Sequence, residues 1–239
     1  MTPEILFLDN HLLVVAKPAG MLSQGDSTGD RDVANWAKAF LKREFNKPGN
    51  VFVGLVQRLD RPASGLMVLA RTSKAASRLT EQFRKRSVEK VYLALVEGKL
   101  EGSGRLEDWL FKTHDAETGT RVKRVSSTTS GAKKAVLEWR ALATVRGRTL
   151  VRVVLETGRP HQVRVQLGGI GHPIVGDLRY AAPVPLGDGH SIALHAAHLA
   201  LDHPTQKDRR RFTAAPPPAW GEDFARPIEA EVRVLAGRE

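Results

Sequence analysis

The sequence predicts an α+β domain built on a mixed, mostly antiparallel sheet with a few flanking helices. Two observations carry this prediction. Short apolar runs bounded by turn residues dominate the chain, and many of them are neighbours in sequence. We interpret only three segments as helices from their apolar spacing and capping residues. With 239 residues, 41% of them hydrophobic, the chain can bury a substantial core, and we expect a single domain over residues 1–239.

The first half predicts a hairpin, two helices and two further strands. Residues 5–8 and 12–16 form the hairpin, and Asp9 and Asn10 supply its turn. Asp32 caps a helix, and Thr72 or Ser73 caps a second one that runs to about Arg86. The remaining predicted strands are 51–56 and 66–70, joined by a loop over 57–65.

The second half is richer in strands. Residues 101–134 are basic and poorly periodic, which indicates a long loop or a hairpin excursion. Pro160 suits the first position of a short helix. Residues 181–190 read as a surface loop and the prolines 216–218 as an extended connector. The predicted strands are 90–96, 135–145, 149–155 and 192–201.

Composition excludes several classes of protein. The chain has no cysteine, which removes disulfides, thiolate nucleophiles and cysteine-based metal sites. Its eight histidines lack the spacing of zinc ligands, so no metal is expected. No signal peptide or membrane-spanning run is visible, and we expect a soluble, cytoplasmic protein. A net charge of +11 favours a polyanionic partner such as RNA, although a basic surface without that role would show the same charge.

Asp60 is the first candidate for chemistry. It stands between Arg58 and Arg61, and two nearby cations favour the charged form of a carboxylate. Pro62 fixes the chain direction, and Ser64 and Gly65 permit a tight bend, so we expect a rigid loop. Taken alone, such a tetrapeptide is better explained as a turn aspartate that pairs with an arginine for stability.

A second candidate cluster lies in residues 157–164. A helix that begins at Pro160 would offer unpaired N–H groups to an anion, with Arg159 beside them. His161 and Arg164 would share one helical face, and Gln162 lies between them. An ordinary amphipathic helix with solvated polar residues explains the spacing equally well. We interpret the dense glycines of 168–176 as structural.

Tyr92 and three basic groups complete the candidates. In a strand, Tyr92 faces away from the core side formed by its apolar neighbours, so its ring could stack on a base; a partly buried sheet tyrosine is the alternative. Each basic group could be a solvated charge run, but we expect at least one to contact an RNA backbone. The groups are Arg84, Lys85 and Arg86 with Lys90; Arg121, Lys123, Arg124, Lys133 and Lys134; and Lys207 with Arg209, Arg210 and Arg211.

Together these segments resemble the RluA family of RNA pseudouridine synthases. The matching motifs occur in the family's order over about residues 5–215, nearly the whole chain. They are Leu12–Gly20 with its Lys-Pro-Ala-Gly end, Arg58-Leu59-Asp60-Arg61 with Ser64-Gly65-Leu66, the strand Lys90–Ala94, Thr157–Arg164, and Gly171–Asp177.

The resemblance implies the pseudouridine-synthase catalytic fold, with a cleft across its sheet, and isomerisation of uridine to pseudouridine. It implies Asp60 as the catalytic aspartate, Tyr92 as the residue that packs on the target base, and Arg164 as the arginine that pairs with the aspartate. Arg58 would hold the surroundings of the flipped nucleotide, and we expect Arg61, Arg159, His161 and Gln162 to contact the substrate as well. The chain departs from the family at Gln57 and Gln166, where histidine is common, and at Ala63, where threonine is common.

The resemblance also sets expectations about substrates and partners. The substrate is a structured RNA, either transfer or ribosomal, and the reaction is redox-neutral and consumes no water, so no cofactor is expected. We expect a monomer without an obligate protein partner and without the N-terminal S4-type RNA-binding domain that many relatives carry. Two other classes stay open: an RNA-binding protein without catalysis, and a carboxylate-dependent nuclease or glycosidase, for which a second acidic residue is missing.

Overall fold

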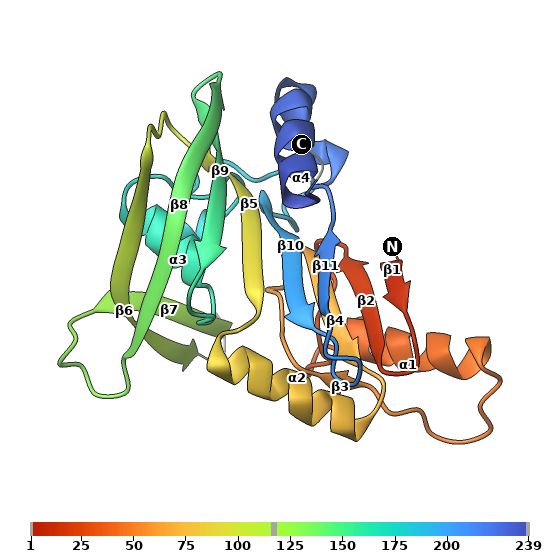
Figure 1. Cartoon of the computed structure of the whole chain (residues 1–239). Helices are drawn as coiled ribbons and strands as arrows, with labels where there is room; N and C mark the ends of the chain where they lie inside the picture. The colour runs from red at the N-terminus through yellow and green to blue at the C-terminus, as the bar shows by residue number, and fades with distance from the viewer. Residues whose placement is uncertain (1, 116–118, 238–239) are drawn as a thin grey trace. The chain divides into compact units, whose positions relative to one another are not determined.

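The computed structural model describes residues 2–115 and 119–237, which fold into two compact units (Figure 1). The first unit draws its residues from Met1–Glu89, His195–Pro216 and Val232–Glu239, and the second from Lys90–Leu194 and Pro217–Glu231. The prediction of one domain over the whole chain is not tested by this division and stays a prediction.

The first unit is a mixed sheet with two helices. Its strands follow the order β1-β2-β4-β10; β3 pairs with β4, and β11 with β10. The pair of β4 and β10 is parallel, and the other pairs are antiparallel. The elements are β1 (Glu4–Leu8), β2 (Leu12–Lys17), α1 (Val33–Glu44), β3 (Gly54–Leu55), β4 (Ser64–Ala70), α2 (Ser73–Lys85), β10 (Leu194–Asp202) and β11 (Arg209–Thr213).

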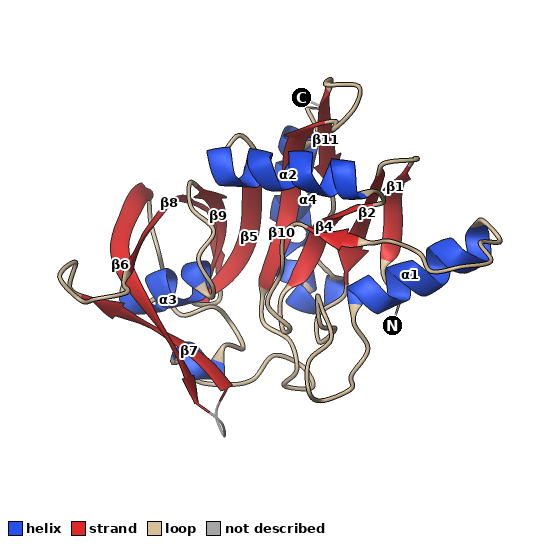
Figure 2. Cartoon of the chain, turned by 90° about the horizontal axis from the view of Figure 1, so that it is seen from below, coloured by secondary structure: helices blue, strands red, loops and turns tan. Residues whose placement is uncertain are grey.

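Helix α2 covers one face of this sheet (Figure 2). The Thr72 hydroxyl accepts a hydrogen bond from the Ala75 amide at 3.1 Å, as predicted for a cap. Arg86, in the left-handed conformation, ends the helix. The core beneath it contains the buried side chains of Leu12, Val14, Leu66, Val68, Leu79, Leu199 and Leu201. Alternate residues of β2 and β4 therefore supply the face on which α2 packs.

The second unit contains five antiparallel strands in the order β5-β9-β8-β6-β7. The basic segment predicted as a loop or hairpin is a hairpin, because β6 and β7 pair from Trp109 to Asp115. The elements are β5 (Glu89–Glu97), β6 (Ser103–Asp115), β7 (Gly119–Val125), β8 (Lys133–Val145), β9 (Arg148–Leu155), α3 (Gln162–Gly169) and three short 3₁₀ turns at Leu178–Tyr180, Pro218–Trp220 and Glu222–Phe224.

Two predicted boundaries are wrong, and one helix was not predicted. The strand predicted over 51–56 shrinks to Gly54–Leu55, because only these two residues pair with β4. The short helix begins at Gln162 and not at Pro160, since His161 has a φ of +51° that a right-handed helix cannot contain. Helix α4 (Ala225–Leu235) was missed. Its signal is the spacing of Ile228 and Leu235, both buried, on one helical face.

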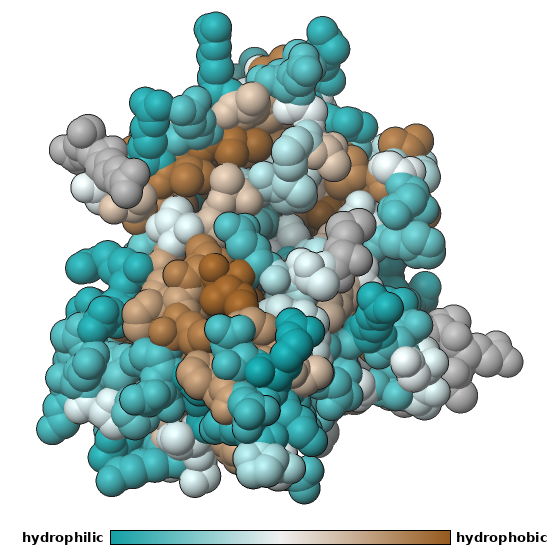
Figure 3. Space-filling view, turned by 90° about the vertical axis from the view of Figure 1, so that its right-hand side faces the viewer, coloured by the Kyte–Doolittle hydropathy of each residue, from teal (hydrophilic) through white to brown (hydrophobic). Residues whose placement is uncertain are grey.

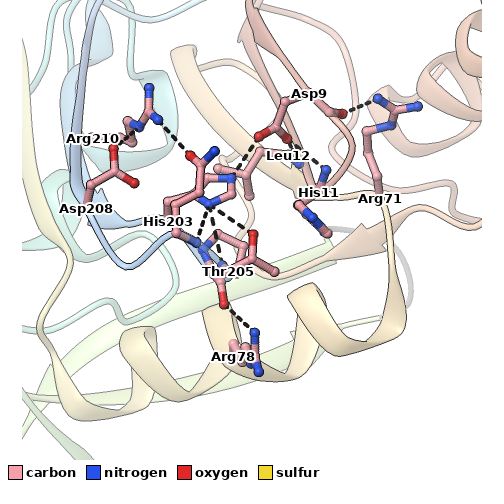
Figure 4. Close-up of polar contacts among 11 residues, drawn as sticks. Asp9, His11, Leu12, Arg71, Arg78, His203, Thr205, Asp208 and Arg210 are labelled. Carbon is pink, nitrogen blue, oxygen red and sulfur yellow. Dashed lines mark hydrogen bonds and ion pairs between the residues drawn. The ribbon is translucent and has the colours of Figure 1, made fainter.

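The first hairpin is held by a polar cluster around its turn (Figure 4). One oxygen of the Asp9 carboxylate accepts the amides of His11 and Leu12, each at 2.7 Å, which confirms the predicted turn. The other oxygen lies 2.8 Å from His203 Nε2, and the Arg71 guanidinium donates to the Asp9 carbonyl. The turn between β1 and β2 is thereby tied to the segment that joins β10 and β11.

The surface seen in Figure 3 is mainly hydrophilic, with apolar patches between charged side chains. The large apolar side chains that stand exposed in the structure include Phe45, Phe52, Leu178, Val184 and Val234. Among the described residues, no helix has the length and apolar character needed to cross a membrane.

Candidate active site

The loop that carries Asp60 runs from β3 to β4 and closes on a tight turn. The Ala63 amide donates to the Asp60 carbonyl at 3.1 Å, with Arg61 and Pro62 at the centre of the turn. Leu59 is buried, and its amide and carbonyl both bond the Ser23 hydroxyl, at 3.0 and 2.7 Å. Asp60 itself is half-buried. The loop is therefore anchored on both sides of the carboxylate, as its composition predicts.

A buried lysine, Lys17, forms hydrogen bonds to the backbone of this loop. Lys17 is 0% exposed, and its Nζ donates to the carbonyls of Arg61 at 3.2 Å and Ala63 at 2.6 Å, both just after Asp60. It also donates to Pro18 and Met21 at 3.0 and 2.8 Å. Burial lowers the pKa of Lys17 to about 7; the Asp60 charge opposes this shift and Arg61 adds to it. Lys17 thus joins the Lys-Pro-Ala-Gly segment to the Asp60 loop.

The two arginines that flank Asp60 in sequence differ in their surroundings. Arg61 pairs with Asp30 at 2.7 Å, and its Nε donates to the Gly20 carbonyl at 3.1 Å. Arg58 is exposed and forms no ion pair within the described part of the chain. Arg61 therefore has a structural role in holding the loop, while the Arg58 side chain stands open to a ligand.

The strand that follows the loop begins at Ser64, and its first residues dock tightly on β10. Ser64 Oγ lies 2.8 Å from His195 Nδ1, and His195 Nε2 lies 3.1 Å from the Ala214 carbonyl. A carbonyl only accepts, so Nε2 carries the proton and Nδ1 accepts from Ser64. Burial lowers the pKa of His195 to about 4, so the ring is neutral at pH 7. Ser64 and Gly65, expected to permit a bend, instead start β4.

Gly65 is required at this contact. Its φ is +116°, and a Cβ there would lie 2.4 Å from the Ala196 amide nitrogen of β10. Any other residue would push the two strands apart beside the Asp60 loop.

Tyr92 lies on β5 of the second unit, opposite Val153 of β9. Val91, Leu93 and Leu95 are buried, but so is Ala94, which shares the face of Tyr92, and Tyr92 itself is half-buried. This burial fits both contact with a base and the alternative of a partly buried sheet tyrosine, so the role of Tyr92 stays a prediction.

Arg164 of α3 is held by a buried ion pair. Its Nε and Nη2 donate to the two carboxylate oxygens of Asp177 at 2.7 and 2.8 Å, and the side chains are 6% and 1% exposed. The guanidinium carbon lies 5.0 Å from the centre of the Tyr180 ring. Such a fork fixes the guanidinium plane. Asp177 ends the glycine-rich motif interpreted as structural, and its pairing with Arg164 was not foreseen.

The neighbours of Arg164 brace the start of α3. Gln162 is buried, and its Oε1 accepts from Thr157 Oγ1 at 2.7 Å and the Arg159 amide at 3.0 Å. Arg159 Nε donates to the Lys134 carbonyl at 2.9 Å, and His161 Nδ1 bonds the Tyr180 hydroxyl at 2.7 Å. Residues 162–167 are all buried, so α3 has no solvated polar face. These contacts are structural; the predicted substrate contacts of the three residues stay predictions.

The basic groups also differ in their pairing. Arg84 and Lys85 share Glu81, at 2.6 and 3.3 Å, and Arg86 is exposed at the end of α2. Lys90 is half-buried on β5. In the hairpin group, Arg124 pairs with Asp108 and Lys134 with Glu107. Within the described residues, no three or more His, Asp or Glu side chains cluster as metal ligands.

Asp60 belongs to the first unit, and Tyr92 and Arg164 belong to the second. The pairing of Asp60 with Arg164 therefore stays a prediction. Within each unit the structure reveals a supporting residue that the motifs did not single out, Lys17 below the Asp60 loop and Asp177 beside Arg164. The signal for Lys17 was a lysine directly after an apolar strand. For Asp177 it was an acid at the end of the glycine run.

Comparison with known proteins decides what this arrangement serves. Residues 11–168, well over half of the chain, match the sequence profile of the RNA pseudouridylate synthase family. The chain belongs to this family. It is an RNA pseudouridine synthase of the RluA type, an enzyme that isomerises uridine to pseudouridine in RNA.

Relatives of this synthase cover most of the chain. The ribosomal large subunit pseudouridine synthase D of Pseudomonas aeruginosa is 34% identical over 233 residues, which span 92% of this chain and 69% of the relative. Its namesake from Nitrosomonas europaea is 36% identical over 84% of this chain and 58% of its own. The dual-specificity RNA pseudouridine synthase RluA of Vibrio vulnificus is 34% identical over 84% and 78%.

Solved structures confirm the predicted pseudouridine-synthase fold. The human RNA pseudouridylate synthase domain containing 4 aligns with a TM-score of 0.73 at 24% identity, over 95% of this chain and 92% of the other. The human domain containing 1 aligns with a TM-score of 0.69 at 21% identity, over 98% and 95%.

Proposed function

We propose that this synthase modifies a uridine of large-subunit ribosomal RNA, with Asp60 as its catalytic carboxylate. The names of its relatives favour this substrate, because most of those compared are named for the ribosomal large subunit. Transfer RNA, the other substrate expected from the sequence, is the second class to test, and one relative is named a dual-specificity RNA pseudouridine synthase.

The reaction requires a carboxylate that can reach the target nucleoside. The bond between the sugar and N1 is broken, the uracil turns, and a bond to C5 forms. A stacked uridine cannot do this in place, so it must be flipped out of the RNA. Asp60 then attacks the sugar as a nucleophile or removes a sugar proton as a base. All atoms stay in the nucleotide, so the isomerisation needs no external oxidant, reductant or water.

The other proposed residues bind and orient the nucleotide. Tyr92 packs on the flipped base, and Arg164 pairs with Asp60. Arg58, Arg61, Arg159, His161 and Gln162 are proposed to lie near the substrate, and Arg84, Lys85, Arg86 and Lys90 to contact the RNA backbone. The single observation that carries the proposal is the anchored Asp60 loop. Lys17 and Ser23 hold the loop backbone on either side of Asp60, and a carboxylate carried on a rigid backbone loses less freedom when it reacts.

We further propose that the enzyme acts as a monomer in the cytoplasm. A net charge of +11 attracts RNA and opposes the association of identical chains.

The decisive experiment maps pseudouridines in total RNA from cells with the gene, without it, and with Asp60→Asn. We expect the gene to be required for pseudouridine at one or a few positions of large-subunit RNA. Asp60→Asn should abolish these pseudouridines. RNA binding by the purified variant should change less than about twofold, since only one carboxylate oxygen is replaced.

Glu44→Gln is the control for a carboxylate changed to an amide, because Glu44 is an exposed acid at the end of α1 that forms no ion pair among the described residues. It should keep most activity. An active Asp60→Asn enzyme would remove Asp60 from its role. A pseudouridine lost from transfer RNA alone would overturn the proposed substrate class and leave the activity intact.

A further inference from the structure

A polar pocket opens in the first unit beside the Asp60 loop. It has a cavity volume of about 590 Å³ and lies between the first turns of α1 and the segment that leads from β3 to Asp60. That volume is within the range of small-ligand sites. Arg58, on its rim, stands only two residues before Asp60, and two extended residues span about 7 Å. Two nucleotides that are adjacent in one RNA strand could therefore occupy the pocket and the position beside Asp60.

The pocket combines an apolar wall with two available cations. Val53, Leu55 and Val56 form the wall. Lys38 and Arg58 line the pocket, and neither forms an ion pair among the residues the structure describes. A planar apolar base and a phosphate find complementary partners here.

The one acidic lining residue is already satisfied within the protein. Asp32 caps α1: its Oδ1 accepts the Asn35 amide at 2.9 Å, and its Oδ2 accepts Asn35 Nδ2 at 2.7 Å. Asp32 is 3% exposed, so its charge presents little surface to a ligand. The exposed charge of the lining is therefore positive and suits an anion.

Two side-chain amides could recognise a base. Gln24 is exposed on one side of the pocket. Gln57 lies on the other, where its Nε2 makes only a long hydrogen bond of 3.4 Å to the Leu66 carbonyl. An amide offers a donor and an acceptor side by side, the pattern that pairs with the edge of a purine such as adenine.

We propose that this pocket binds the nucleotide next to the target uridine in the same RNA strand, with Lys38 and Arg58 on its phosphate and the glutamine amides on its base. This inference rests on the proposed function. It makes the pocket a site of sequence recognition, separate from the carboxylate that performs the isomerisation.

The first test compares two cations of one helix. Lys38 and Arg43 are both exposed on α1, and five residues at about 100° each turn them roughly 140° apart, so only Lys38 lines the pocket. The substrate is a stem-loop cut from the transcript that acquires pseudouridine in cells. We expect Lys38→Ala to raise KM about tenfold with kcat within about twofold, the loss of one charged hydrogen bond. Arg43→Ala should change both less than about twofold.

The second test asks whether the pocket recognises a base. The nucleotides on either side of the target uridine are randomised, and the modified molecules are sequenced. We expect the wild-type enzyme to prefer a base at one flanking position, and Gln24→Ala to weaken that preference alone. Ala34→Phe, which fills the pocket from α1, should raise KM while a melting curve checks its fold.

A third measurement does not depend on activity. 4-Thiouridine is placed at each flanking position, and the RNA is crosslinked to the Asp60→Asn protein. Crosslinks to peptides that contain Gln24, Lys38 or residues 53–58 are expected. Crosslinks confined to other peptides, or equal effects of Lys38→Ala and Arg43→Ala, would overturn the pocket assignment. If the wild-type protein crosslinks through the pocket but forms no pseudouridine, the proposed function fails and the pocket assignment stands.

Discussion

Lys17 has the least usual environment of any charged side chain near Asp60. It has no exposed surface, and its ammonium group, with three N–H donors, lies within hydrogen-bond distance of four backbone carbonyls. Without a donor, buried carbonyls lose water without gaining a partner, which costs free energy for each group. Lys17 therefore joins two loops through hydrogen bonds to their backbone carbonyls. An apolar residue at this position could not form these bonds.

We predict that Lys17→Met lowers the free energy of unfolding by about 3 kcal/mol and reduces pseudouridine formation with it. Because burial lowers the folded-state pKa of Lys17 to about 7 from an ordinary 10.5, the folded protein loses this proton before the unfolded chain does. The wild-type protein should then gain stability over Lys17→Met by about 1 kcal/mol per pH unit as pH rises above 7.

Urea unfolding of both proteins at several pH values between 6 and 9.5 measures this difference, with Lys42→Met, an exposed lysine of α1, as the control. A gap between wild type and Lys17→Met that stays constant with pH would show that Lys17 keeps its proton throughout.

The sequence predicts the positions of single residues well where local residue types restrict the backbone. Asp60, Pro62 and Tyr92 have the loop or strand positions expected of them. Lys17 and Asp177 were not predicted, because their roles depend on carbonyls and a guanidinium that are distant in sequence. Gln162 has a structural role that the sequence did not reveal, because its side-chain amide braces the loop before α3; its predicted contact with the substrate stays a prediction.

At the scale of elements, helices and strands follow their patterns where local chemistry decides, as in α2 with its threonine cap and left-handed end. The alternative of an amphipathic α3 with solvated polar residues is wrong, because residues 162–167 are all buried and the side-chain nitrogens of Gln162 and Gln166 donate to protein groups. The start of α3 is set by His161, whose left-handed backbone is stabilised by tertiary contact with Tyr180. No local pattern records such a contact.

The ion pair between Arg164 of α3 and Asp177, in the turn after Ile174, allows the structural role of Arg164 to be tested separately from its proposed catalytic role. We predict that Asp177→Asn destabilises the protein by about 3–5 kcal/mol, because it removes the buried negative charge that accepts two hydrogen bonds from the Arg164 guanidinium. The double variant Arg164→Met with Asp177→Leu replaces the ion pair with apolar groups and should recover much of this stability.

Thermal or urea unfolding measures stability, and pseudouridine formation is measured in parallel. If Arg164 orients Asp60, the double variant folds and is inactive. A folded and active double variant would remove Arg164 from the catalytic set and leave it a structural role.

Across the whole molecule, some cationic side chains are paired with acidic ones and others are not, so they differ in how readily they can contact RNA. Arg84 and Lys85 are partly neutralised by Glu81, and Arg124 and Lys134 by acids of β6. Arg121, Lys123 and Lys133 are exposed, and no ion pair engages them among the described residues. Cations without a protein partner are the ones that replace counterions on phosphates without first breaking a pair.

We therefore predict that RNA affinity falls steeply with salt and that the unpaired hairpin cations account for a measurable part of the slope. Each phosphate contact contributes about −0.7 to −0.9 to the slope of log K against log salt. The double variant Lys123→Gln with Lys133→Gln should flatten the slope by about 1–2. The double variant Arg84→Gln with Lys85→Gln removes the same formal charge but should change the slope less, because these two cations are already paired with Glu81. Fluorescence anisotropy of a labelled stem-loop at several salt concentrations measures both slopes. Equal slopes for the two double variants would mean that net charge alone, and not the pairing of each cation, governs RNA binding.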